Sequence, residues 1–286
     1  MLTYNDGCLG KCAYCGLSKS RYINGLWTEK SFIRVDWPIV PLEEVLRRMD
    51  DERCSHVERV CISMVTHKRA REDILTIVKA LRKKIDAISA LITPTIVTKK
   101  WLYDLKEAGA DKIGVAVDAA TLELFDKLRG RAVGGPHRWD RYWQVVEDSV
   151  EIFGKYNVGV HFIVGLGETE EEMVKAIQKA YDMGALTHLF SFFPEEGSLL
   201  ENHSQPPIGT YRRIQLARYL INKGISRYEN MKFDDKGRII DFGISKEVYN
   251  KVVESGLPFM TSGCASKNRE GACNSPFLNC TPYKHT

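Results

Sequence analysis

Three cysteines near the start of the chain have a spacing that suits a metal centre. Cys8, Cys12 and Cys15 are separated by three and by two residues, so one short loop carries all three thiolates. Thiolates arranged in this way favour soft metals, above all iron–sulfur clusters. A [4Fe–4S] cluster has four irons, and three cysteines leave one iron open to a small molecule, which predicts a centre that takes part in chemistry. The alternatives are a disulfide and structural zinc, which usually needs a second C-x2-C pair.

A second group of cysteines lies in the last part of the chain. Cys264, Cys273 and Cys280 are separated by eight and by six residues, in a segment (261–286) without helical or strand periodicity. Such a segment needs a source of order other than an apolar core, and a metal site provides one. A second iron–sulfur cluster is the favoured interpretation, and zinc with His285 as fourth ligand is the alternative. The fourth iron would stay open or take an oxygen ligand from a serine: Ser262, Ser266 or Ser275.

Between these two groups, short apolar runs alternate with amphipathic stretches, which predicts parallel βαβ units. Strands are expected at 57–65, 87–94, 112–117, 158–164 and 186–192. Helices are expected at 41–49, 72–84, 99–108, 121–128, 139–155, 170–183 and 211–222. With a first strand just before the cysteine motif we count six units, too few to close an eight-stranded barrel. A hairpin over 231–242 and a helix over 245–255 are expected to follow, so we divide the chain into a barrel (1–228) and a C-terminal extension (229–286).

Composition and charge exclude several classes of protein. The chain has 286 residues, 44% hydrophobic and 27% charged, as in an ordinary soluble globular protein. A formal charge of +4 without a basic cluster argues against nucleic-acid binding. No apolar run approaches the roughly 18 residues of a membrane span. Residues 1–4 are no signal peptide, so a cytoplasmic protein is expected, with its eight cysteines as metal ligands or buried thiols and further residues upstream of this sequence.

The first motif, C-x3-C-x-aromatic-C with Tyr14 as the aromatic residue, resembles that of the radical S-adenosylmethionine (SAM) superfamily. The resemblance implies an α/β fold, an open partial (β/α)6 TIM-like barrel, here with a hairpin–helix extension and an irregular cysteine-rich tail. It also implies that Cys8, Cys12 and Cys15 bind a [4Fe–4S] cluster whose fourth iron chelates SAM. An electron from the cluster then cleaves SAM to a 5′-deoxyadenosyl radical, and Tyr14 packs near the adenine.

Two strand ends resemble the SAM-binding elements of this superfamily. The segment SMVTH, which contains Ser63 and Thr66, stands where backbone carbonyls hold the amino group of SAM. The segment IVGLGETE, which contains Ile163 and Gly165, resembles the element that contacts adenine, although His161 stands where its first glycine should be. An ordinary strand–turn–helix junction is the alternative for the second segment.

Charged side chains near the strand ends also have two interpretations each. Asp118 ends one expected strand and could accept hydrogen bonds from a ribose, or it could cap the helix that begins at Thr121. Arg129, Arg138 and Arg141 are candidates for binding the carboxylate of SAM, because a guanidinium can donate two parallel hydrogen bonds to it. The alternative for each arginine is a solvated surface charge.

Longer segments point to one branch of the superfamily. The segments CISMVTH, VGLGETEEE and HLFSFFPEEGS, together with the tail cysteines, resemble the archaeal-type lipoyl synthase made of two radical SAM proteins. This implies a sulfurtransferase in which the cluster at Cys264, Cys273 and Cys280 gives up a sulfide to a carbon radical. The substrate would be an octanoyl chain on a lysine of a carrier protein, either a lipoyl domain or the H protein of glycine cleavage. A second radical SAM subunit and an electron donor such as ferredoxin are the other implied partners.

Two other functions stay open at this point. One is a radical SAM enzyme of another class, biotin-synthase-like or acting on peptide or tRNA, whose second cluster anchors substrate or relays electrons. The other is a non-catalytic subunit that scaffolds a partner. Loss of sulfide during turnover would distinguish sulfur insertion from a radical SAM enzyme of another class. Formation of 5′-deoxyadenosine would exclude a non-catalytic subunit.

Overall fold

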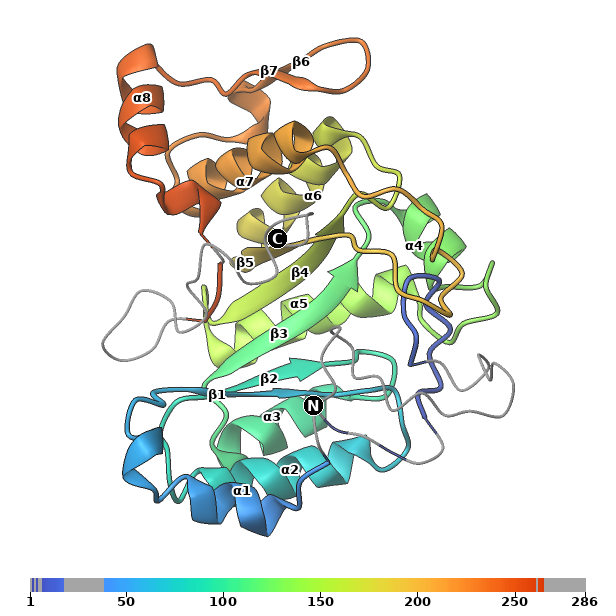
Figure 1. Cartoon of the computed structure of the whole chain (residues 1–286), viewed down its shortest axis with the longest axis vertical. Helices are drawn as coiled ribbons and strands as arrows, with labels where there is room; N and C mark the ends of the chain where they lie inside the picture. The colour runs from blue at the N-terminus through green and yellow to red at the C-terminus, as the bar shows by residue number, and fades with distance from the viewer. Residues whose placement is uncertain (1, 3, 5–6, 18–38, 261, 265–286) are drawn as a thin grey trace.

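The computed structural model describes residues 2, 4, 7–17, 39–260 and 262–264. Within these residues one sheet contains five parallel strands in the order β1-β2-β3-β4-β5 (Figure 1). The strands are β1 Val60–Ser63, β2 Ile88–Ile92, β3 Lys112–Asp118, β4 Val158–Val164 and β5 Leu186–Ser191. The five predicted strands after the cysteine motif are confirmed, and the α/β fold is that of a partial barrel.

The strand expected before the cysteine motif falls largely on residues outside the described ones. Of that segment the structure describes Leu2 and Tyr4. The backbone N–H of Leu2 donates to the carbonyl of Ser63 at 3.0 Å, which places this residue beside the end of β1. The Tyr4 ring stacks on His67 with 3.9 Å between ring centroids. The start of the chain therefore lies where a sixth strand would pair with β1.

Helices follow the strands as the periodicity predicts. Local signals set their ends: Thr98 and Thr121 cap α3 and α4 with their hydroxyls, and Gly109 ends α3 with φ 118°. Thr169 and Glu172 form the capping box at the start of α6 that the sequence predicts. The helices are α1 Leu42–Arg48, α2 Ala70–Leu81, α3 Lys99–Ala108, α4 Leu122–Leu128, α5 Trp139–Phe153, α6 Glu170–Asp182 and α7 Ile208–Asn222, with short 3₁₀ turns at Glu52–Cys54, Tyr228–Asn230 and Leu257–Phe259. No helix in the described ranges is long and apolar enough to cross a bilayer.

The two faces of the sheet carry different side chains. In β3, Ile113, Val115 and Val117 belong to the apolar core, and β3 packs on α5. The alternate residues point to the opposite face, which we call the inner face, because successive strand residues point to opposite sides. By the strand register this face includes the small and polar residues Cys61, Ser89, Gly114, Ala116, Gly159, His161 and His188, and the apolar residues Leu91, Ile163, Leu186 and Phe190. The inner face thus carries small and polar residues among a few apolar ones, whereas the outer face forms the core.

Two glycines make room for histidine rings on the inner face. A Cβ on Gly114 would lie 3.1 Å from His161 Nε2, and a Cβ on Gly159 would lie 2.5 Å from His188 Nε2. The two imidazole rings meet edge to face with 5.2 Å between centroids. Each ring therefore lies over the glycine of the neighbouring strand, and a larger side chain there would displace it.

The C-terminal extension packs on α6 and α7. It contains the predicted hairpin, β6 Lys232–Phe233 and β7 Ile239–Asp241, and the helix α8 Lys246–Glu254 (Figure 1). The buried carboxylate of Glu170 receives two hydrogen bonds from Arg213, and its Oε2 accepts the backbone N–H of Ile239 at 2.9 Å. One carboxylate thus joins α6, α7 and β7, while the division into two domains at residue 228 stays a prediction.

Candidate active site

The cysteine loop, residues 7–17, lies at the carboxyl ends of the strands (Figure 1). The N–H of Leu9 donates to the carbonyl of Thr66, just after β1, at 2.8 Å. The N–H of Ala13 donates to the carbonyl of Leu128, at the end of α4, at 2.6 Å. Since these two anchors belong to different βα connections, the loop spans the edge of the sheet at which active sites of barrel enzymes lie.

The three thiols of the loop are reduced and half-buried. The N–H of Gly10 donates to Cys8 Sγ at 3.3 Å, and the N–H of Leu17 donates to Cys15 Sγ at 3.4 Å. Burial raises the pKa of the Cys12 thiol and raises that of Cys15 further above its ordinary value. The Cys12 and Cys15 thiols are therefore neutral until a metal displaces their protons. All three cysteines are free, so the disulfide alternative is wrong.

The donor set fits a cluster better than a single ion. Within residues 7–17, 39–260 and 262–264, no three His, Cys, Asp or Glu side chains are grouped so that they could hold one ion. A [4Fe–4S] cluster binds each thiolate through a different iron, so the sulfurs need not meet at one point. Reduced cysteines on one loop, with backbone N–H groups directed at two of the sulfurs, fit this cluster with one iron left open.

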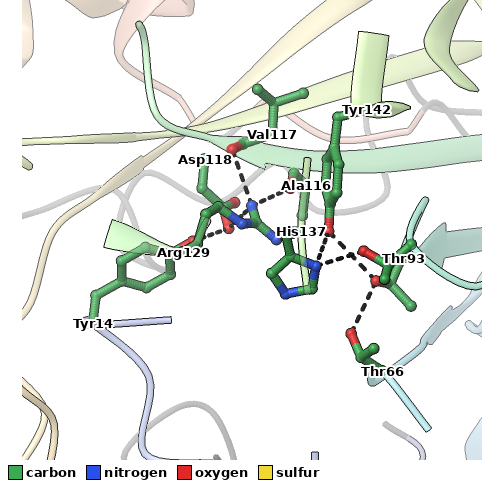
Figure 2. Close-up of polar contacts among 10 residues, drawn as sticks. Tyr14, Thr66, Thr93, Ala116, Val117, Asp118, Arg129, His137 and Tyr142 are labelled. Carbon is green, nitrogen blue, oxygen red and sulfur yellow. Dashed lines mark hydrogen bonds and ion pairs between the residues drawn. The ribbon is translucent and has the colours of Figure 1, made fainter. Parts of the chain in front are cut away.

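Tyr14 connects the loop to the end of β3. Its ring is 7% exposed and packs with Phe192, and its hydroxyl donates to Asp118 Oδ2 at 2.5 Å (Figure 2). Asp118 lies in the left-handed region with φ 68°, directly after a bulge in the pairing of β3 with β4. This bulge turns the carboxylate toward the loop, because Asp118 leaves the regular alternation of the strand. Asp118 does not cap the next helix, since Thr121 does so, and that alternative is wrong.

Arg129 fixes the same carboxylate from the other side. Its Nη1 contacts Asp118 Oδ2 at 2.6 Å and also donates to the carbonyls of Ala116 and Val117. Its Nη2 donates to the Tyr142 hydroxyl at 3.0 Å (Figure 2). Arg129 is only 4% exposed, so the interpretation of this residue as a solvated surface charge is wrong. The guanidinium holds the end of β3 in its bulged shape, and its role toward the carboxylate of SAM stays a prediction.

A chain of hydroxyls continues from Tyr142 to the end of β1. Nδ1 of His137 lies 2.9 Å from the Tyr142 hydroxyl and 2.6 Å from Thr95 Oγ1. The Thr66 and Thr93 hydroxyls are 3.0 Å apart and both are buried (Figure 2). Burial, with the charge of the Arg129 guanidinium, lowers the pKa of His137 to about 2, so its imidazole is neutral. A buried polar network therefore underlies the cysteine loop.

The loop between β4 and α6 is held by a carboxylate. Glu168 accepts the N–H of Gly165 at 2.7 Å and that of Leu166 at 3.0 Å. Burial raises the pKa of Glu168 to about 7, although these two hydrogen bonds oppose the rise. Gly165 has φ 102°, and a Cβ there would lie 2.7 Å from Pro206, so only glycine fits. The hydrogen bonds of Glu168 and the glycine at position 165 thus fix the shape of this turn. The expected contacts of Ile163 and Gly165 with adenine stay predictions.

The carbonyls expected to hold the amino group of SAM are partly engaged. Ser63 accepts the N–H of Leu2, and Thr66 accepts the N–H of Leu9. A carbonyl oxygen has two lone pairs, so each can accept a second hydrogen bond. The end of β1 thus positions the cysteine loop, and its role toward SAM stays a prediction.

Arg141 lies apart from the Tyr14–Asp118 network. It lines a groove of about 950 Å³ between α4 and the start of α5, together with Arg131 and Arg138. Its Nη2 donates to the carbonyl of Val97 at 2.6 Å. The structure brings Tyr14, Asp118 and Arg129 together and leaves Arg141 in this groove.

The first tail cysteine lies at the opposite end of the strands from the cysteine loop. The backbone of Ser262 lies near the ring of His188, on the inner face. Cys264 lies near Arg59, which precedes β1 and donates to Ser89 Oγ at 3.0 Å. Residues 262–264 therefore lie on the inner face near the amino ends of β1 and β2. The other predicted tail ligands, Cys273, Cys280 and Ser275, lie outside the described residues, as do Ser266 and His285.

Several residues of the site have no local signal in the sequence. His137 follows Gly135 and Pro136, which indicates only a turn before a helix. Tyr142 sits on the core side of α5 and has the pattern of an ordinary apolar position. Their importance arises from contacts with Arg129 and the cysteine loop, which periodicity cannot predict.

A family model described as the radical SAM superfamily matches residues 2–180. The chain belongs to the radical SAM superfamily. The [4Fe–4S] cluster and SAM expected from the sequence are the cofactors that this membership implies, and the Cys8 loop supplies the fitting donor set.

Curated relatives match part of the chain. A probable GTP 3′,8-cyclase of Saccharolobus islandicus (strain Y.N.15.51 / Yellowstone #2) is 27% identical over 125 residues, 43% of this chain and 38% of the relative. One from Thermoplasma volcanium is 25% identical over 122 residues, 43% of this chain and 36% of the relative. The chain spans little more than a third of the length of these relatives. They are named for a cyclisation, so the lipoyl synthase branch predicted from the sequence gains no support from them.

Solved structures support the fold. Methylornithine synthase (PylB) superposes with a TM-score of 0.58 at 16% identity, over 76% of this chain and 60% of that one. HydG, a maturase of the [FeFe]-hydrogenase, superposes with a TM-score of 0.59 at 14% identity, over 76% of this chain and 48% of that one. At these identities the likeness concerns the fold alone.

Proposed function

We propose that this radical SAM protein is an enzyme that abstracts a hydrogen atom from its substrate, and that a second metal centre at Cys264, Cys273 and Cys280 holds that substrate. The observation that supports this is the placement of Cys264. It lies by Arg59 near the amino ends of the strands, whereas the cysteine loop lies across their carboxyl ends. The inner face, with its small, polar and apolar side chains, lies between the two.

The first centre supplies the radical. When bound, a cluster of this superfamily provides the electron that cleaves SAM to a 5′-deoxyadenosyl radical. The protein positions the loop through Tyr14, Asp118 and Arg129. Both contacts of Asp118 use Oδ2, so Oδ1 keeps its acceptor capacity for a ligand such as the ribose of SAM. Tyr14, Leu166 and Phe192 form a small apolar cluster beside the loop that excludes water from this side of the site.

The names of the curated relatives favour substrate binding as the role of the second centre. A cyclisation within GTP adds no sulfur to the product, so a second centre in an enzyme of that kind would bind substrate or relay electrons. This accords with a tail cysteine on the inner face, where a bound molecule lies between the two centres. The cysteines of the tail then act as metal ligands and donate no atom to the product.

Sulfur insertion is the second candidate. It is favoured by the tail trio together with the segments that resemble archaeal-type lipoyl synthase. In that case an octanoylated carrier protein is the substrate, a second radical SAM subunit is a partner, and one sulfide leaves the second centre for each sulfur inserted. Ferredoxin is the proposed electron donor in both cases.

Iron and product analysis tests the two centres separately. Anaerobically reconstituted protein should form 5′-deoxyadenosine from SAM and a reductant, and it should carry about eight irons per chain. Cys264→Ala should retain SAM cleavage with about four irons. The matched control is Cys54→Ala, which removes another half-buried cysteine and should retain all the iron. An iron-loaded wild type that forms no 5′-deoxyadenosine would contradict the proposal and favour a non-catalytic scaffold.

Sulfide measured during a single turnover distinguishes the two candidate functions. GTP and an octanoyl-lysine peptide are supplied in parallel, and sulfide, 5′-deoxyadenosine and product are followed together. The proposal expects the second centre to keep its sulfide. A thiolated octanoyl product with matching loss of sulfide would overturn substrate binding and establish sulfur insertion.

A further inference from the structure

We infer that His137 donates a hydrogen bond from Nε2 to the sulfur of Cys8 when the cluster is bound, and that it thereby raises the reduction potential of the cluster. The inference concerns the cysteine-loop cluster alone and does not depend on the second centre or on the substrate. His137 is 2% exposed and lies two residues before the start of α5. The hydroxyl of Tyr142, a residue of that helix, contacts its ring.

The neighbours of Nδ1 decide which ring nitrogen carries the proton. Arg129 can only donate, so the Tyr142 hydroxyl accepts from its Nη2 and must place its own proton on another acceptor. His137 Nδ1 lies 2.9 Å from that hydroxyl, whereas Thr93 Oγ1 lies 3.5 Å away. The Thr95 hydroxyl also faces Nδ1, at 2.6 Å. We therefore assign Nδ1 as the acceptor, which places the proton of the ring on Nε2.

Gly10 shows where Nε2 points. A Cβ built on Gly10 would lie 3.1 Å from His137 Nε2 and 3.2 Å from Cys8 Sγ, so nitrogen and sulfur flank the same point. None of the ring hydrogen bonds between His137 and the described residues uses Nε2. The absence of a side chain at Gly10 leaves the space between the imidazole and the sulfur open. The Gly10 N–H donates to the same sulfur, which would thus receive two N–H groups.

The effect on the potential follows from charge. Reduction adds an electron to the cluster, and a donor at a ligand sulfur stabilises the added negative charge more than the oxidised state. The effect is strengthened by burial, because electrostatic interactions are less screened away from water. Removal of the donor should therefore lower the potential. His137 acts through the sulfur and is a positioning residue, since it touches no reacting atom.

Redox titration of the iron-loaded protein without SAM tests the inference. His137→Phe keeps a flat ring without the donor, and the midpoint potential should shift to a more negative value. His137→Gln offers an amide N–H in the same direction and should restore the potential toward that of the wild type. His56→Phe, which replaces an exposed histidine after the first 3₁₀ turn, should leave the potential unchanged.

Pulsed EPR of the reduced wild type labelled with ¹⁵N-histidine tests the contact directly. A weak coupling to one histidine nitrogen is expected, and it should vanish in His137→Gln while the potential is retained. If His137→Phe fails to bind iron, the wild-type EPR spectrum and the His137→Gln variant still test whether His137 contacts the cluster. No ¹⁵N coupling in the wild type, or an unchanged potential in an iron-loaded His137→Phe, would overturn the inference.

Discussion

The Tyr14 hydroxyl donates to Asp118 Oδ2 at 2.5 Å, although the two residues are 104 positions apart in the chain. Asp118 is 9% exposed and also contacts Arg129. The cysteine loop and the bulged end of β3 are therefore joined through one carboxylate (Figure 2). The loop is positioned by this buried network as well as by its own backbone.

Substitutions at Tyr14 and Asp118 should lower the free energy of unfolding by different amounts, because the two side chains have different roles in the network. Tyr14→Phe removes one buried hydrogen bond and should cost about 1–2 kcal/mol of the free energy of unfolding. Asp118→Asn leaves the buried Arg129 guanidinium without its counter-charge and should cost more, about 3–5 kcal/mol. Urea unfolding of the cluster-free protein measures both. Asp104→Asn, which removes an exposed carboxylate paired with Lys100, is the control, and equal losses for Asp118→Asn and this control would refute the prediction.

Removal of a loop cysteine should abolish radical formation and leave the tail centre in place. Cys12→Ala takes away one of three thiolates, and a metal site rarely survives such a loss. We expect no 5′-deoxyadenosine, and iron retained only at the tail. Iron analysis and product chromatography measure both outcomes. Continued reductive cleavage of SAM by Cys12→Ala would refute the assignment of the cluster to this loop.

Glu168 should make stability depend on pH. Its folded pKa of about 7 lies above the ordinary value of 4.5, so between these values the native state holds a proton that the unfolded state releases. The free energy of unfolding from this group should therefore fall as pH rises from about 4.5 through 7. Glu168→Gln should flatten this part of the stability profile of the cluster-free protein.

Glu123→Gln is the matched control, since it replaces an exposed carboxylate on α4. It should leave the dependence on pH as in the wild type. A profile of Glu168→Gln that matches this control would show that Glu168 does not hold a proton in the native state.

Glu170 should stabilise the docking of the C-terminal extension. Glu170→Gln weakens the contact with Arg213 and the hydrogen bond from Ile239, and should cost about 1–3 kcal/mol of unfolding free energy. Hydrogen exchange should speed up first in β7 and α8, because their link to α6 is lost. Glu254→Gln, an exposed change on α8, is the control. Unchanged exchange in β7 would show that this carboxylate does not hold the extension.

The sequence by itself determined the helices, the strands and the cysteine loop. The predicted bounds of α3 and β4 agree with those observed, because periodicity and the nearby caps Thr98 and Gly109 are local properties of the chain. The loop motif likewise places three ligands within eight residues, so its spacing alone indicated the superfamily. These signals extend over no more than a few turns of helix or one strand.

Only the tertiary structure decided how the residues of the site are paired. From the local pattern, Asp118 could be either a ligand of a ribose or the cap of a helix. The bulge at the end of β3 directs its carboxylate to Tyr14 and Arg129. The sequence gives no signal that His137 lies against Gly10, or that the tail brings Cys264 beside Arg59. Apart from Asp118 and Arg129, these partners are about 100 residues or more apart, and packing of the sheet and helices brings them together. Periodicity within a short window carries no information about such contacts.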